Sequence, residues 1–150
     1  MPQSLSFVIV HVIFSTKDRE PLLEPGVRPA AHAYLAEVAR NLDCECYEVG
    51  GVNDHVHLAI RLSRTLTIAD LIKELKTSSS AWIKKRSPDL RRFAWQRGYG
   101  CFSVGPKDVN ALRDYIREQD QHHEKRSFQD EFRRFLKQYG VKYDEAYVWD

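Results

Sequence analysis

The segment that most restricts the fold is residues 7–14, which has the sequence FVIVHVIF. Its residues are apolar at both odd and even positions, and many of them are β-branched. A strand with one face in solvent alternates apolar and polar residues, whereas a strand packed on both faces shows a continuous apolar run. We therefore expect residues 7–14 to form a central strand that is covered on both sides.

Three further segments are predicted to be strands. Residues 55–62, HVHLAIRL, alternate strictly and predict a second central strand. Residues 44–50 predict a strand that ends at the Gly50-Gly51 pair, and residues 93–104 predict a bent strand or hairpin with Gly98 and Gly100 at the bends.

Helical spacing of apolar residues predicts the remaining elements. Thr67 and Asp108 precede two of these segments and are expected to cap them. The predicted helices cover residues 30–41, the segment between Thr67 and Pro88, residues 109–124 and residues 128–139. The resulting order, β-α-β-β-α-β-α-α, predicts an α+β fold with a ferredoxin-like antiparallel sheet and helices mainly on one face. The other face would be open to a ligand or a second subunit.

Length and composition indicate one globular domain spanning residues 1–150. The chain has 150 residues, of which 43% are hydrophobic and 29% charged, which is too apolar for a disordered chain. No apolar run is long enough to cross a bilayer. The N-terminal residues lack a positively charged leader, and the three cysteines cannot all pair. We therefore expect a cytoplasmic protein.

Basic residues gather between residues 84 and 97, together with Phe93 and Trp95. Basic side chains interleaved with aromatic rings suit a polyanion whose bases can stack, although a solvated loop would show the same charges. We predict that the nucleic-acid contacts come from Lys84, Lys85, Arg86, Arg91, Arg92, Trp95 and Arg97. In this prediction the Trp95 ring supplies base stacking.

The alternating strand places His55 and His57 on one face, opposite the apolar row of Val56, Leu58 and Ile60. Two imidazoles on one face can hold a metal ion and leave coordination positions open. The alternative is a pair of surface histidines on a half-buried strand.

Tyr115 and Gln119 are four residues apart, so they share one side of the predicted helix over residues 109–124. A tyrosine attacks a phosphodiester at neutral pH only when a cation neutralises the group under attack, because the phenol pKa is near 10. A metal ion on His55 and His57 would supply that charge, and the Gln119 amide oxygen could be a third ligand. The alternative is a boundary tyrosine beside a solvated glutamine.

Three stretches together resemble a known family of DNA-processing enzymes. They are NDHVHL at residues 53–58, WQRGYG at residues 95–100 and DYIREQ at residues 114–119. The chain resembles the single-tyrosine transposases of small bacterial insertion sequences, which belong to the His-hydrophobic-His (HUH) endonuclease superfamily. REP-associated tyrosine transposases share this pattern. The resemblance covers nearly the whole chain, from Phe7 to the C-terminal residues.

The resemblance implies a chemistry and a set of partners. It implies that His55, His57 and Gln119 bind Mg²⁺ or Mn²⁺, and that Tyr115 attacks a phosphate in single-stranded DNA. The products would be a 5′-phosphotyrosine link and a free 3′-hydroxyl. It also implies hairpin DNA near the ends of a mobile element, and a homodimer whose active sites are shared between subunits.

Other functions are compatible with the same residues. These are a domesticated hairpin-DNA-binding protein that no longer cleaves, a replication-initiator or relaxase-type nickase, and a metal-dependent hydrolase that uses water. The roles of His11, Asp54, His122 and His123 also stay open. His11 could line the face of His55 or be a core histidine, and Asp54 could orient an imidazole or belong to a turn. His122 and His123 could contact phosphate or offset the helix dipole.

Overall fold

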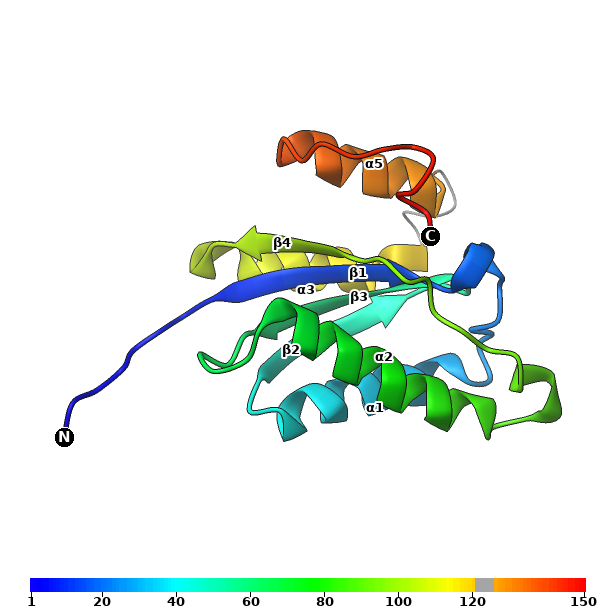
Figure 1. Cartoon of the computed structure of the whole chain (residues 1–150), viewed down its shortest axis with the longest axis horizontal. Helices are drawn as coiled ribbons and strands as arrows, with labels where there is room; N and C mark the ends of the chain where they lie inside the picture. The colour runs from blue at the N-terminus through cyan, green and yellow to red at the C-terminus, as the bar shows by residue number, and fades with distance from the viewer. Residues whose placement is uncertain (121–125) are drawn as a thin grey trace.

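Four antiparallel strands form one sheet in the order β2-β3-β1-β4 (Figure 1). They are β1 (Ile9–Ser15), β2 (Glu45–Gly51), β3 (His55–Arg61) and β4 (Gly100–Val104). These elements come from a computed structural model that describes residues 1–120 and 126–150. Every residue of β1 is buried, and this strand lies between β3 and β4, which confirms the central strand predicted from the continuous apolar run.

Two long helices cover one face of the sheet, α1 (Arg28–Asn41) and α2 (Ile68–Lys84) (Figure 1). The core beneath them contains Val12, Phe14, Leu58 and other apolar side chains of β1 and β3. The Thr67 hydroxyl accepts a hydrogen bond from the Asp70 backbone N–H, which confirms the predicted cap of α2. Three short 3₁₀ helices lie between the longer elements, at Lys17–Arg19, Pro88–Leu90 and Pro106–Asp108.

The opposite face of the sheet is covered as well, so the predicted open face is wrong. It carries α3 (Val109–Arg117) and α5 (Phe128–Gln138) (Figure 1). Packing is close, because a Cβ on Gly50 would lie 2.5 Å from the Ile116 carbonyl oxygen and one on Gly100 would lie 2.5 Å from the Phe132 ring. The physical reason is that both helices are amphipathic and bury their apolar stripes on the sheet.

Two element boundaries differ from the sequence-based expectation. The predicted strand over residues 93–104 is reduced to β4, because Phe93 and Trp95 turn into the core before the strand begins. Helix α3 ends at Arg117, with Glu118 in a turn, and Asp108 precedes it without a side-chain capping bond. His122 and His123 lie outside the described residues. No described helix has the length and apolar content that a membrane span requires.

His32 on α1 makes stability depend on pH. Burial, reinforced by Arg28 and opposed by Asp120, lowers the pKa of His32 to about 4, and among the described residues its buried Nε2 has no hydrogen-bond partner. Between pH 4 and the ordinary histidine pKa of about 6.5, the unfolded chain binds more protons than the folded chain. The free energy of unfolding should therefore fall by about 2 kcal/mol between pH 7.5 and pH 5 through this group alone.

Urea unfolding of the wild type and a His32→Leu variant at both pH values measures this contribution. The loss of stability at pH 5 should be about 2 kcal/mol smaller in the variant. Equal losses in the two proteins would contradict the assignment, because the other titrating groups are the same in both.

Candidate active site

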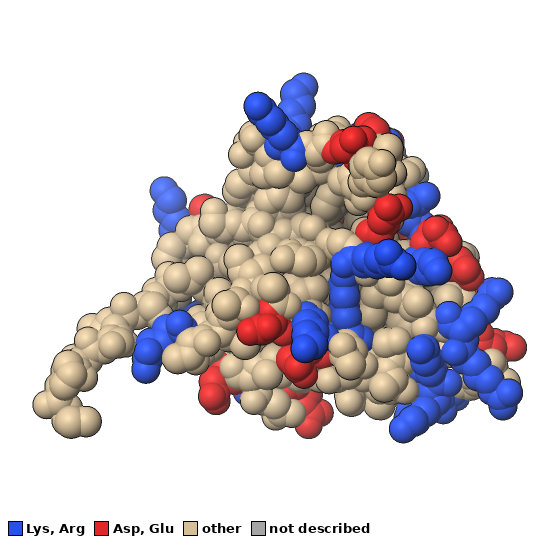
Figure 2. Space-filling view, viewed as in Figure 1, with Lys and Arg blue, Asp and Glu red and all other residues tan. Residues whose placement is uncertain are grey.

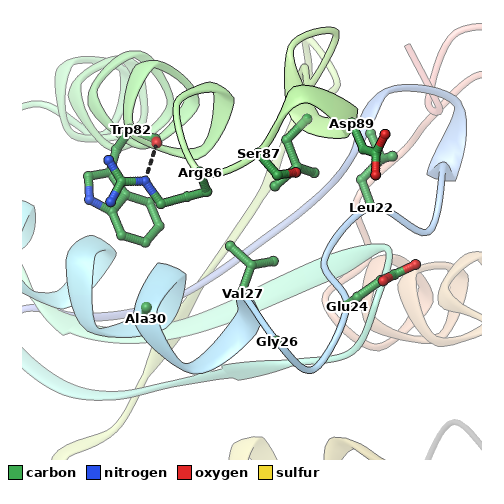
Figure 3. Close-up of a pocket in the computed structure, with 10 residues that line it drawn as sticks. Leu22, Glu24, Gly26, Val27, Ala30, Trp82, Arg86, Ser87 and Asp89 are labelled. Carbon is green, nitrogen blue, oxygen red and sulfur yellow. Dashed lines mark hydrogen bonds between the residues drawn. The ribbon is translucent and has the colours of Figure 1, made fainter.

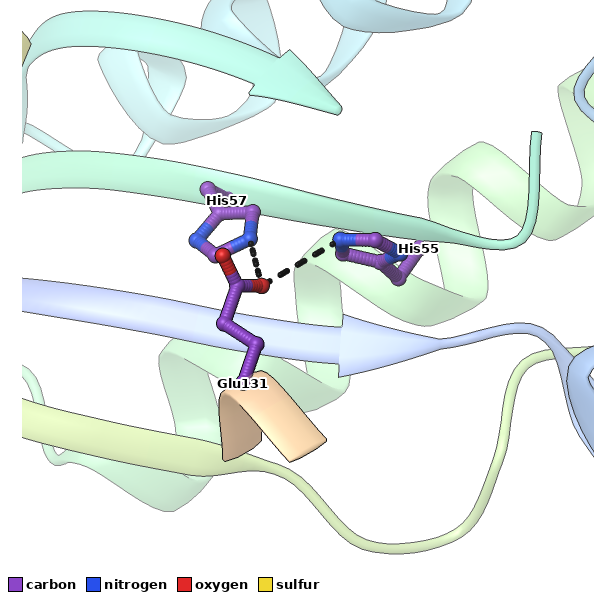
Figure 4. Close-up of side chains that lie close together, drawn as sticks. All are labelled: His55, His57 and Glu131. Atoms are coloured by element: carbon purple, nitrogen blue, oxygen red, sulfur yellow. Dashed lines mark hydrogen bonds and ion pairs between the residues drawn. The ribbon is translucent and has the colours of Figure 1, made fainter. Parts of the chain in front are cut away.

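His55 and His57 lie side by side on β3 and face the side of the sheet that α5 covers (Figure 4). Both side chains are fully buried, while Val56 and Leu58 between and beyond them pack in the core on the opposite face. The alternation of the sequence predicted this orientation correctly. The alternative of two surface histidines is wrong, because neither ring reaches solvent.

Each imidazole is fixed through its Nδ1 atom. Asp54 Oδ1 lies 2.7 Å from His55 Nδ1, and His11 Nε2 lies 2.8 Å from His57 Nδ1. Histidines that bind metals commonly have their second ring nitrogen held in this way, which orients the first. The two Nε2 atoms therefore point into the same buried space, and Asp54 and His11 are the residues that hold them there.

Glu131 of α5 brings a carboxylate to that space (Figure 4). Its Oε1 lies 2.9 Å from His57 Nε2 and 3.5 Å from His55 Nε2, and the side chain is 1% exposed. One ligand atom from each of the three residues lies within 4.8 Å of the others. Two imidazole nitrogens and a carboxylate oxygen are a donor set that suits a divalent transition-metal ion, so the residues present fit a metal site.

Tyr115 and Gln119 reach the same carboxylate. The Tyr115 hydroxyl donates a hydrogen bond to Glu131 Oε2, and Arg134 Nη2 donates to the Tyr115 oxygen at 3.3 Å. Gln119 donates from its Nε2 to Glu131 at 3.4 Å, and its Oε1 lies 3.3 Å from His55 Nε2. The four residues singled out from the sequence thus converge within one chain, although the helix that carries Tyr115 ends before Gln119.

A cavity of about 370 Å³ opens beside Tyr115, between α3, α5 and the end of β4. Its lining includes His11, Tyr115 and Arg134. Tyr115 is half-buried rather than sealed in the interior. The cavity therefore leaves room for a phosphate group of a nucleic-acid strand beside the phenol oxygen.

Burial and neighbouring charges shift three pKa values at the site. Burial raises the pKa of Tyr115 well above its usual range, and the adjacent Glu131 raises it further. Burial and the neighbouring His57 lower the pKa of His11 well below its usual value. For His55, burial lowers the pKa, but the hydrogen bonds that its ring donates to the Asp54 and Glu131 carboxylates outweigh burial, and the net shift of the pKa is upward. The phenol is therefore protonated at neutral pH, and its proton must leave when the oxygen attacks.

The basic window is exposed, with the exception of its aromatic residues. Figure 2 shows a gathering of basic side chains over the end of α2 and the loop after it. The six basic residues of the predicted contact surface are exposed, namely Lys84, Lys85, Arg86, Arg91, Arg92 and Arg97. Their positions are compatible with contacts to a DNA backbone.

Trp95 does not lie on this surface, which corrects its predicted place among the stacking residues. Its side chain is 8% exposed, and its ring packs edge-on against Phe14 and Phe93 at 4.8 Å between centroids. Its Nε1 donates a 2.9 Å hydrogen bond to Ser79 Oγ. Because its ring packs in the core and its indole N–H is hydrogen-bonded to α2, Trp95 stabilises the fold and is not available to stack on a base.

The sequence-based prediction missed Glu131, although a signal for it exists. The buried positions of α5 are Phe128, Glu131, Phe132 and Leu136, which follow helical spacing. A glutamate on an otherwise apolar stripe would be costly to bury without partners. The position of Glu131 on this stripe therefore indicates that other buried polar groups bind its carboxylate.

Comparison with models of protein families identifies the family of this chain. Residues 4–119 match the model of the family described as IS200-like transposases. Because this match covers most of the chain, the protein belongs to that family. Glu131 and α5 lie beyond the matched residues. A search of curated proteins finds no match.

Two solved structures share the fold. A crystal structure of a transposase candidate from Deinococcus radiodurans R1 has a TM-score of 0.64 and 23% identity, with 79% of this chain and 98% of that chain covered. A REP-associated tyrosine transposase bound to a REP hairpin has a TM-score of 0.59 and 16% identity, with 82% of this chain and 74% of that chain covered.

Proposed function

We propose that this chain cleaves and rejoins single-stranded DNA during transposition, with Tyr115 as nucleophile and Mg²⁺ or Mn²⁺ as cofactor. The observation that carries the proposal is the convergence of the Tyr115 phenol, the two histidine Nε2 atoms and the Gln119 amide on one buried carboxylate. The metal ligands would be His55 and His57, with oxygen ligands from Glu131 and Gln119. A DNA transposase family and a metal-compatible donor set support this assignment.

In the proposed reaction, the Tyr115 oxygen forms a bond to the phosphorus and the bond from phosphorus to the 3′ oxygen breaks. When held by His55, His57, Glu131 and Gln119, a divalent ion would supply the positive charge that offsets the negative charge of the phosphate under attack. The phenol proton passes to Glu131 Oε2, the acceptor that it already contacts. The departing 3′ oxygen takes up a proton from water and becomes a hydroxyl. Arg134 lies beside the phenol oxygen, where it can contact the phosphate.

We also propose that the substrate is a strand marked by a hairpin. A structural neighbour is bound to a REP hairpin, and the exposed basic residues of the window at residues 84–97 offer this chain a surface for DNA phosphates. The hairpin would place the cleavage site relative to the active centre.

End-labelled oligonucleotides test this proposal. Hairpin-bearing strands incubated with the protein and Mn²⁺ should give a covalent adduct that retains a label on the 3′ end of the strand. A label on the 5′ end should instead appear in a shortened free strand with a 3′-hydroxyl. Binding without any adduct would favour the domesticated DNA-binding protein, and cleavage without an adduct would favour a hydrolase that uses water.

A mixing experiment tests whether the homodimer implied by the resemblance shares its active sites. We expect a mixture of Tyr115→Phe and His57→Ala proteins to form no more adduct than the two proteins form separately. The reason is that Tyr115 already contacts Glu131 of its own chain, beside that chain's His57. Recovery of adduct in the mixture would contradict this, because it would show that one subunit supplies Tyr115 to the other.

A further inference from the structure

A second cavity lies on the α1 and α2 side of the sheet, away from the candidate active site (Figure 3). It has a volume of about 480 Å³ and lies between the start of α1 and the end of α2. Leu22, Val27 and Leu90 give it an apolar lining. The loop before α1, which forms one wall of the cavity, is hydrogen-bonded to the turn that precedes β3. The Leu23 N–H donates to the carbonyl of Asn53, two residues before His55.

One end of the cavity is formed by a stack of flat side chains (Figure 3). The Trp82 ring stacks on Tyr34 with 5.1 Å between centroids and 20° between planes. The Arg86 guanidinium lies over the same Trp82 ring, with its carbon 4.4 Å from the centroid. Arg86 Nε also donates to the Trp82 carbonyl at 3.1 Å, which fixes the guanidinium in place. Aromatic rings and guanidinium planes are the surfaces on which proteins stack unpaired bases.

The charges around the cavity suit a nucleotide rather than an apolar partner. Lys84, Lys85 and Arg91 are exposed and lie next in sequence to the lining residues Arg86 and Leu90, so they are candidates for phosphate contacts beside the cavity. Glu24 and Asp89 line the end opposite to Trp82 and Arg86 (Figure 3). A carboxylate accepts hydrogen bonds only, so these two residues favour a base edge that donates. Guanine alone offers a carboxylate two adjacent donors, its N1–H and its exocyclic amino group.

We propose that this cavity binds one unpaired guanine of the DNA strand, stacked on the Arg86 guanidinium, which Trp82 supports from beneath, and held by Asp89 or Glu24 through its donor edge. This inference rests on the proposed DNA function and adds a site of base recognition to it. The basic residues beside the cavity hold the backbone on either side of the bound base. The site is separate from the metal and tyrosine residues, so binding and cleavage can be measured independently.

Fluorescence anisotropy with short labelled strands tests the proposal without knowledge of the natural target. The probes are an oligo(dT) strand, the same strand with one central guanine, and a third strand with inosine in place of that guanine. The wild type should bind the guanine strand about tenfold more tightly than oligo(dT). Inosine should lose most of this preference, because it lacks the exocyclic amino group.

Three variants separate base recognition from phosphate contacts. Arg86→Ala and Trp82→Leu should reduce the guanine preference to less than about twofold, because each removes part of the stack. Arg92→Ala, whose side chain is exposed and does not line the cavity, should weaken binding to all strands equally and leave the preference intact. Arg86 is exposed, so its replacement tests the site even if Trp82→Leu unfolds the protein.

The outcomes distinguish this inference from the proposed function. Binding of all strands with equal affinity by the wild type would overturn the guanine site and leave the DNA function standing. A guanine preference that survives in Arg86→Ala would overturn it as well. Failure of the wild type to bind any of these short strands at low salt would also overturn the guanine site, whereas the DNA function is tested separately by the hairpin-bearing strands of the cleavage assay.

Discussion

Replacing Tyr115 with phenylalanine is expected to reduce DNA cleavage by at least about 10³-fold, because it removes the oxygen that we propose forms the covalent link. DNA affinity should change by less than about twofold, since the phenol oxygen is used in the reaction and not in holding the backbone. The protein should stay folded, because His57 and Gln119 still contact the Glu131 carboxylate. Adduct formation and anisotropy on the same strand measure both quantities.

Tyr47→Phe is a matched control for this variant. It makes the same chemical change on β2, where the Tyr47 hydroxyl donates to Glu45 Oε2 at 3.5 Å and the side chain does not line the cavity beside Tyr115. Cleavage should be close to that of the wild type. Cleavage that persists in Tyr115→Phe would show that another nucleophile is used.

Glu131→Gln is expected to weaken Mn²⁺ binding by about 10- to 100-fold. The change keeps the shape of the side chain but removes the charged oxygen that faces both histidine Nε2 atoms. Isothermal titration of the free protein with Mn²⁺ measures this without DNA. Cleavage should fall as well, because the phenol proton loses its acceptor.

Asp130→Asn provides the control on the same helix. It removes one negative charge at the neighbouring position, where the exposed carboxylate pairs with Arg133 outside the site. Its Mn²⁺ affinity should equal that of the wild type. An unchanged affinity in Glu131→Gln would mean that α5 covers the site without supplying a metal ligand.

The strands and the faces of their residues could be predicted from the sequence, because alternation and continuous apolar runs depend only on local geometry. This was sufficient to place His55 and His57 on one face, opposite Val56 and Leu58. The pairing of Tyr115 with Gln119 also followed from local spacing, although the helix ends between them. These predictions needed no knowledge of which elements pack together.

The errors concern contacts between segments that lie far apart in the chain. The basic residues around Trp95 suggested that its ring faces solvent. Instead, the ring packs against Phe14 in the core and its Nε1 donates a hydrogen bond to Ser79. The face expected to be open is covered by α5, and that helix brings Glu131 to histidines 74 and 76 positions earlier in the chain. The spacing of apolar residues shows which side of α5 is buried, but it does not show which element that side packs against.

The residue that carries DNA after cleavage identifies the nucleophile most directly. The wild-type protein is allowed to react with a hairpin-bearing strand and Mn²⁺, the adduct is digested with nuclease and protease, and the modified peptide is sequenced by mass spectrometry. We expect a nucleotide joined through its 5′-phosphate to Tyr115. A nucleotide on any other residue, or cleaved DNA with no modified peptide, would contradict this expectation.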